Sequence, residues 1–317
     1  MKNSQNRVKE NKHILIIGGT GFVGKHLVRH FLEKSFTVYS LARNQEIHGR
    51  DNLIPMEGNM NNAVLLRPIL QKCATIIHAA GDSVPGDSIH APMSEVYSNL
   101  IPSVALIETL QEFEYKHIIY ISSGGAVYGN PTVLPASENE PFAPLSYHGA
   151  FKASVETCLH ALTAQTSHKA TILRPSNLYG PGQRNKKNFG LIQAVLNCIR
   201  DDSEITIWGD GATVKDYLYI DDFVDACDKA VFNAPKERMA VYNAGSGIGY
   251  SVNDICAMIE QVARRQIKKT YQPDRLIDPS VIILNNEKIR KDLGWEPEVG
   301  LREGIEQLWT CGDARKT

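Results

Sequence analysis

One stretch of the chain, PLSYHGAFKASVE at residues 144–156, places three side chains that could do chemistry on a single predicted helix. A helix turns by about 100° per residue, so residues four apart share a face and residues five apart do not. Lys152 follows His148 by four residues and Tyr147 by five. The spacing therefore pairs the lysine ammonium with the imidazole, which can act as a general base near neutral pH.

A glycine-rich turn, GGTGFVG, supplies the second chemical feature. Gly18, Gly21 and Gly24 follow the apolar run at residues 13–17 and precede apolar residues at helical spacing. Glycine permits a tight turn and lets backbone N–H groups approach a pyrophosphate, while the helix N-terminus adds partial positive charge. The pattern predicts a dinucleotide site. The same turn and the start of its helix also contribute Thr20, Phe22 and Val23.

The end of the next predicted strand, SLAR, bears on the choice of dinucleotide. An acidic residue at this point would hold the ribose hydroxyls of NAD, whereas Arg43 could meet the 2′-phosphate of NADP. Both NAD and NADP therefore stay open as the cofactor. We expect His78 to be a packed strand-end histidine. Further predicted cofactor contacts are Asn59, Met60, Ala79, Ala80, Gly81, Asn99, Ser122, Lys152 and Pro175.

The elements that must position these groups alternate along the chain. Apolar strand-like runs at residues 75–80, 117–123 and 169–175 are separated by helical stretches. This alternation predicts an α/β fold with a Rossmann doubly wound parallel sheet. After Pro175 the composition changes, because a loop rich in Gly, Pro and Asn follows and the predicted strands and helices no longer alternate as before. This change predicts a smaller C-terminal substrate-binding α/β domain. We divide the chain into a flexible leader at 1–12, a Rossmann domain at 13–176 joined by part of 214–245, and a substrate-binding region at 177–317.

The composition excludes several classes of function. The 34 basic and 35 acidic residues among 317 give a net charge of −1, which offers no general attraction to nucleic acid or an anionic membrane. No apolar run is long enough for a membrane span, and the first residues lack the core of a signal peptide. The six cysteines form no CxxC pair and no metal-ligand spacing. We expect a cytoplasmic protein with reduced thiols and no metal site.

Several motifs together resemble the extended short-chain dehydrogenase/reductases, in particular the NAD-dependent nucleotide-sugar epimerase/dehydratase family with its UDP-glucose 4-epimerase-like members. They are the glycine turn, HAAG at 78–81, SSGGAVYG at 122–129, LRPSNLYGPGQ at 173–183 and ITIWGDGATVKDYLYIDDFVDA at 205–226. The resemblance covers residues 13–309. It implies transient oxidation at C4 of a nucleotide sugar, in which a tyrosine four residues before a lysine removes the hydroxyl proton and a serine or threonine assists.

The sequence departs from that family at both hydroxyl-binding positions. His148 stands at the tyrosine position, and Gly124 stands at the serine or threonine position, with Ser123 beside it. We predict His148, Lys152 and Ser123 as the catalytic residues. Two alternatives remain open: Tyr147 acts through a locally irregular helix, or the protein is slow or inactive but still binds nucleotide and sugar.

The resemblance also implies a nucleoside-diphosphate sugar as ligand, a UDP-hexose or UDP-N-acetylhexosamine. Lys215 stands where the family usually has an arginine that clamps the diphosphate, and lysine cannot form the bidentate fork. We expect Trp208 to pack rather than to bind. The predicted substrate contacts are Ser83, Ser123, Asn177, Phe189, Lys215, Arg275 and Asp278. A homodimer through helices near 100–113 and 153–162 is implied. The function hypotheses are a 4-epimerase, an NADPH-dependent 4-keto sugar reductase, and a non-catalytic binding protein.

Overall fold

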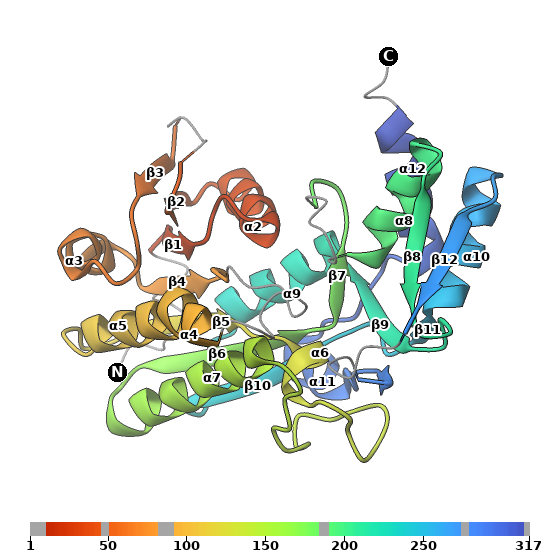
Figure 1. Cartoon of the computed structure of the whole chain (residues 1–317). Coiled ribbons are helices and arrows are strands. Elements are labelled where there is room, and N and C mark those ends of the chain that lie inside the picture. Colours follow the sequence, from red (N-terminus) through yellow and green to blue (C-terminus); the bar gives the residue numbers. More distant parts are fainter. Residues whose placement is uncertain (1–10, 46–50, 82–91, 184–189, 274–278, 314–317) are drawn as a thin grey trace.

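The computed structural model describes residues 11–45, 51–81, 92–183, 190–273 and 279–313 (Figure 1). Most of the predicted leader lies outside these residues. So do four predicted substrate contacts, Ser83, Phe189, Arg275 and Asp278. Within the described part of the chain, no helix is both long enough and apolar enough to cross a membrane.

A seven-stranded sheet, in which every pairing is parallel, forms the larger part of the molecule. Its order across the sheet is β3-β2-β1-β4-β5-β6-β10. The strands are β1 (His13–Ile17), β2 (Thr37–Ala42), β3 (Leu53–Glu57), β4 (Thr75–His78), β5 (His117–Ile121), β6 (Lys169–Pro175) and β10 (Met239–Ala244). The order of the first six is that of a Rossmann sheet, which confirms the predicted fold class.

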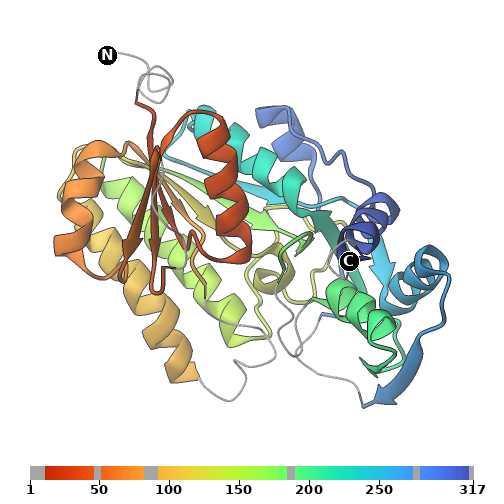
Figure 2. The ribbon, with the colours of Figure 1, turned by 90° about the horizontal axis from the view of Figure 1, so that it is seen from above.

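Helices cover both faces of this sheet, as Figure 2 shows. Side chains alternate between faces along a strand, and β1 is apolar on both. Ile14 and Ile16 pack toward α2 (Phe22–Glu33) and α9 (Ile220–Phe232). On the other face, Leu15 and Ile17 share a core with three helices. These are α3 (Ala63–Lys72), α5 (Ile101–Leu110) and α7 (Tyr147–Gln165).

A second, smaller group of elements lies beside the sheet (Figure 1). Its strand β9 (Val214–Tyr219) pairs with β7 (Asn177–Tyr179), β11 (Gly249–Ser251) and β13 (Val281–Ile282), and β8 (Glu204–Trp208) pairs with β12 (Lys268–Gln272). The helices α8 (Leu191–Arg200), α10 (Val252–Ala263) and α12 (Leu301–Asp313) build its core. Between these elements, α9 and β10 return to the large sheet, and α11 (Glu287–Leu293) packs against β10. The domain boundary at residue 176 remains a prediction.

Three short elements pack against α7. The single turn α6 (Gly124–Val127) follows β5 after two serines, and α4 (Pro92–Glu95) leads through the π-helical turn η2 (Val96–Leu100) into α5. Both α4 and η2 pack against α7. A π-helical turn such as η2 often accompanies a functional site.

Candidate active site

The glycine turn between β1 and α2 has a backbone geometry that requires glycine. Gly18 has φ +89°, and its N–H donates to Leu41 O at 2.8 Å. Gly21 N–H donates back to Gly18 O at 3.0 Å. A Cβ on Gly24 would lie 2.0 Å from Gly18 O. The first turn of α2 carries neither a side-chain cap nor an acidic residue, so its N–H groups suit a bound anion.

Most of the other predicted cofactor residues follow strands whose carboxyl ends lie at the same edge of the sheet. Gly18 lies against the end of β4, where an added Cβ would stand 2.8 Å from Ala80 N. Arg43 directly follows β2 and is exposed, while Asn59 and Met60 follow β3. The predicted residues that follow β2, β3 and β4 thus stand at the same edge of the sheet as the glycine turn, whose bare N–H groups suit a pyrophosphate, whereas Asn99 lies on η2.

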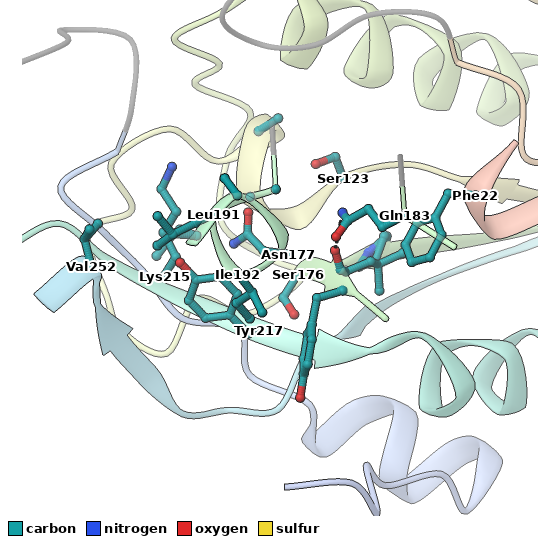
Figure 3. A pocket seen from close by; sticks show the side chains of 18 of the residues that line it. Phe22, Ser123, Ser176, Asn177, Gln183, Leu191, Ile192, Lys215, Tyr217 and Val252 are labelled. Carbon is teal, nitrogen blue, oxygen red and sulfur yellow. Dashed lines mark hydrogen bonds between the residues drawn. The ribbon is translucent and has the colours of Figure 1, made fainter. Parts of the chain in front are cut away.

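A cavity of about 970 Å³ runs from this turn to the second group of elements. Figure 3 shows Phe22 at one end and Lys215 and Val252 at the other, with Ser123 and Asn177 between them. The wall contains eleven predicted site residues, which are Phe22, Val23, Ala79, Gly81, Ser122, Ser123, His148, Lys152, Pro175, Asn177 and Lys215.

The start of α7 decides which aromatic side chain faces the cavity. Ser146 caps the helix, and its Oγ accepts a hydrogen bond from Gly149 N at 3.2 Å. One turn of regular helix then separates His148 from Lys152, and both line the cavity. Tyr147 is 44% exposed and is not part of the cavity wall. The structure thus shows the arrangement that the spacing predicts, without the helix irregularity that a role for Tyr147 requires.

Lys152 and His148 both have perturbed acid–base properties. The Lys152 ammonium donates to Ile121 O at 2.8 Å and lies 5.0 Å from the centre of the Tyr120 ring. Burial lowers the pKa of Lys152 to about 8, although Glu156 and Glu95 oppose this shift. Burial, and then the charge of Lys152, lower the pKa of His148 to about 3. At neutral pH the imidazole is therefore uncharged beside an ammonium group.

Gly124 has a structural reason to lack a side chain. A Cβ at this position would stand 2.5 Å from Leu284 Cδ1 and 3.2 Å from Arg174 O. Leu284 is fully buried, so its side chain has little room to move away. Ser123 instead lies on the cavity wall. Ser123 thus offers the hydroxyl that Gly124 lacks. The sequence did not show that Leu284 fills the space beside Gly124.

A buried polar network fixes α7 behind the cavity. Glu156 forms a salt bridge with Arg174, whose Nη2 lies 2.7 Å from Oε2, and it also accepts from Ser122 Oγ. Arg174 Nη1 donates to Tyr128 OH at 2.7 Å. This network joins β5, α6, α7 and β6, so Lys152 one turn away from Glu156 is held in place. The Ser122 hydroxyl, which we predicted to contact the cofactor, donates its hydrogen bond to Glu156 in this network.

The far end of the cavity is positioned by β9 and its neighbours. Asn177 Nδ2 donates to Asp216 O at 2.9 Å, and Lys215 precedes that aspartate on the wall. Asp216 is buried and accepts from Ser246 N at 2.9 Å and Ser246 Oγ at 2.7 Å. Trp208 differs from expectation, because at the end of β8 it is 40% exposed and lines the cavity. Other lining residues that we missed include Gln183, Leu191, Ile192, Tyr217 and Val252.

Comparisons with known proteins agree with this geometry. The model of the NAD dependent epimerase/dehydratase family matches residues 14–245. A UDP-glucose 4-epimerase of Thermotoga maritima, solved with UDP-glucose, is 30% identical with a TM-score of 0.88, over 96% of this chain and 99% of that one. A Thermus thermophilus UDP-glucose 4-epimerase, solved with NAD, is 25% identical with a TM-score of 0.84, over 93% and 96%.

A curated relative with a different activity is also similar. The dTDP-4-dehydro-6-deoxyglucose reductase of Escherichia coli is 29% identical over 93% of this chain and 96% of its own length. The family match extends over most of the chain, and the family is NAD dependent, which confirms the prediction of a dinucleotide cofactor. The resemblance drawn from the motifs is likewise confirmed. The chain belongs to the NAD dependent epimerase/dehydratase family.

Proposed function

We propose that this protein is an NAD(P)-dependent nucleotide-sugar epimerase that acts at C4 of a UDP-hexose through a transient 4-keto sugar. The observation that carries the proposal is the position of His148 and Lys152. They line the cavity that runs from the glycine turn to Lys215. The similar Thermotoga structure holds UDP-glucose, which supports a ligand of this class.

Each residue would have a defined role. NAD, when bound, supplies the hydride acceptor and donor. The glycine turn and the N-terminus of α2 would hold its pyrophosphate, and the Lys152 ammonium would donate to its ribose. His148, uncharged at neutral pH, would accept the proton of the sugar 4-hydroxyl as hydride leaves C4, and would return that proton after hydride is delivered to the other face.

The sugar nucleotide would be held mainly by charge and by hydrogen bonds. Ser123 would orient the sugar oxygen near His148, and Asn177 and Lys215 would hold the diphosphate. Lysine is a point charge without the planar fork of arginine, so we expect a looser grip on the diphosphate than an arginine would give.

A reductase of 4-keto nucleotide sugars is the second candidate. Arg43 at the end of β2 suits a 2′-phosphate, and a reductase is among the relatives. The two activities differ in their use of cofactor, because epimerisation leaves the cofactor unchanged overall while reduction consumes NADPH in step with the product. A third candidate, a protein that binds nucleotide sugar without turnover, rests on His148 and Gly124.

The test is to incubate the purified protein with UDP-glucose or its N-acetyl analogue and to identify the product sugar by NMR. We expect interconversion without net cofactor use. His148→Gln should lower kcat by about 10²- to 10⁴-fold, because the proton acceptor is lost. Tyr147→Phe is the matched control and should leave kcat nearly unchanged, since Tyr147 lies outside the cavity wall.

Other results would redirect the proposal. Stoichiometric NADPH oxidation on a 4-keto sugar supports the reductase. Tight binding without turnover, together with higher activity in His148→Tyr, supports the binding protein. A large loss in Tyr147→Phe with full activity in His148→Gln contradicts the role of His148.

We also propose a cytoplasmic homodimer formed through α5 and α7, as the family resemblance implies. Tyr97, Ile101 and Val104 are exposed on one side of η2 and α5, at spacings of four and three residues that place them on a common face. Light scattering measures the mass directly. Replacing Ile101 with Glu should lower the mass to that of one chain.

A further inference from the structure

The strand β9 is held by short partner strands where it carries Lys215. Of these partners, β11 has three residues and β13 has two. Pairing with β11 ends at Asp216, pairing with β13 ends one residue earlier, and pairing with β7 begins one residue later. The backbone pairing of β9 therefore changes partners at Asp216, directly beside a residue that we assign to the diphosphate.

The Asp216 side chain joins the segments around this change of partners. Only 1% of its surface is exposed. Its Oδ1 accepts from Ser246 N at 2.9 Å and Ser246 Oγ at 2.7 Å, and its Oδ2 accepts from Gly247 N at 3.1 Å and Leu284 N at 3.3 Å. A Cβ on Gly245 would stand 2.5 Å from Oδ2, so this loop packs directly on the carboxylate. The carboxylate thus fastens the loop between β10 and β11, and the segment after β13, to β9.

These four donors suit a carboxylate better than the amide of the same size. They are three backbone N–H groups and one hydroxyl, and a carboxylate has two oxygens that only accept. An asparagine has one acceptor oxygen, and its NH₂ group would point at a donor. Because the site is buried, a donor without an acceptor there is costly, so the amide would loosen the attachment of β9.

Both residues that we assign to the diphosphate depend on the position of Asp216. Neighbouring side chains point to opposite faces of a strand, and Lys215 and Tyr217 on either side of Asp216 line the cavity. Asn177 Nδ2 donates to the backbone oxygen of Asp216 at 2.9 Å. A shift of β9 at Asp216 would therefore move an ammonium group and an amide of the cavity wall together (Figure 3).

We propose that Asp216 is a positioning residue for the diphosphate of the sugar nucleotide. Its buried carboxylate fastens β9 where the strand changes partners, and thereby fixes Lys215 and Asn177 in the cavity wall. This inference rests on the proposed function, because it takes the diphosphate as the group that these two side chains hold.

The experiment measures binding of UDP by calorimetry and of NADH by fluorescence titration, both with the full chain. Asp216→Asn should weaken UDP binding roughly tenfold or more, because Lys215 no longer meets the diphosphate in a fixed position. Affinity for NADH should stay within about twofold, since the glycine turn lies at the other end of the cavity. With UDP-glucose, KM should rise with little change in kcat, as is expected when binding common to the ground and transition states is lost.

Asp222→Asn is the matched control. Asp222 is also a buried carboxylate that accepts from two backbone N–H groups, those of Glu298 and Val299, each at 3.1 Å. It lies on α9, which contributes no residue to the cavity wall, so this variant should leave UDP affinity unchanged. An equal loss of UDP affinity in both variants would show a general effect of removing a buried charge, and would overturn the proposal.

A double-mutant cycle tests whether Asp216 acts through Lys215. In a Lys215→Ala background, Asp216→Asn should weaken UDP binding by no more than about threefold further, because the main group that it positions is gone. Fully additive losses overturn the proposal, as does an unchanged UDP affinity in Asp216→Asn alone.

Two substitutions of Ser246 serve if Asp216→Asn fails to fold by circular dichroism. Ser246→Ala removes the hydroxyl that donates to Asp216 and should weaken UDP binding about threefold, whereas Ser246→Thr keeps the hydroxyl and should bind as the wild type does. Equal UDP affinities in these two variants then overturn the proposal. A wild-type protein that binds no UDP would overturn the proposed function and this inference together, whereas the other contrary outcomes overturn the inference alone.

Discussion

The two ends of the cavity are built from different parts of the polypeptide. At the cofactor end, backbone atoms form the site: the N–H and C=O groups of Gly18 and Gly21 close the turn, and Gly24 admits no side chain. At the catalytic end, the functional groups are side chains, with His148 and Lys152 presented from one face of α7.

This difference explains where the sequence keeps the family pattern and where it departs from it. A backbone site depends on the path of the chain, so any side chain that alters the path removes the site. In a site built from side chains, one residue type can replace another without a change of the backbone, provided that the surrounding side chains fill the altered space. Gly124 and Leu284 are such an adapted pair, because the leucine fills the space of the missing side chain.

The strongest way to test the backbone end is Gly24→Ala. The added Cβ would stand 2.0 Å from Gly18 O, so the turn must open. We expect the affinity for NADH, measured by fluorescence titration, to fall by about 100-fold or more, which is about 2.7 kcal/mol. Gly300→Ala is the control, because a Cβ there meets no atom within 4 Å. Normal affinity in Gly24→Ala would contradict the account of a backbone-built site.

The adapted pair at the catalytic end predicts a coupling between two substitutions. Gly124→Ser alone should destabilise the protein by about 1–3 kcal/mol, because the new side chain meets Leu284. In a Leu284→Ala background the same serine enters vacated space, so its cost should shrink by about 1–2 kcal/mol. Urea unfolding of the four proteins measures this coupling.

The neighbouring glycine provides the control for this cycle. A Cβ on Gly125 would come no closer than 4.0 Å to another residue, the Nδ2 atom of Asn177, so Gly125→Ser should change stability by less than about 0.5 kcal/mol. Strictly additive costs for Gly124→Ser and Leu284→Ala would show that the leucine does not occupy the side-chain space of residue 124.

Local patterns in the sequence predicted the parts of the site that lie close together along the chain. The order of β1, the glycine turn and α2 follows from an apolar run, three glycines and helical spacing within one short segment. The same holds for the face of α7, since helical geometry alone pairs His148 with Lys152. These features need no knowledge of the rest of the fold.

Contacts between distant segments could not be predicted in this way. Nothing near Gly124 in the sequence points to Leu284, which arrives from beyond β13. Glu95 is a charged residue in a short helix, yet it is buried where α4 and η2 pack against α7. Trp208 ends an apolar strand and so resembles a core residue, yet β8 places it at the cavity. Each depends on tertiary packing, which periodicity does not encode.

The contrast between the two ends should also appear in the pH dependence of stability. The glycine turn GGTGFVG has no ionisable side chain, whereas His148 at the catalytic end has its pKa lowered to about 3. An unfolded histidine titrates at about 6.5, so below that pH the unfolded chain binds a proton that the folded chain refuses. Stability therefore falls as the pH decreases from about 6.5 toward 3, by up to about 1.4 kcal/mol per pH unit for each such histidine.

His148→Gln isolates this contribution from those of His78 and His117, which burial also keeps neutral with pKa values lowered to about 3. The variant should lose stability less steeply than the wild type between about pH 6 and about pH 4, by up to about 1.4 kcal/mol per pH unit in urea unfolding. His160→Gln is the control, because its side chain is exposed on the same helix and should leave the slope unchanged. Identical slopes in all three proteins would mean that His148 takes up its proton in the folded state, and the catalytic end would then hold an imidazolium rather than a neutral imidazole in mild acid.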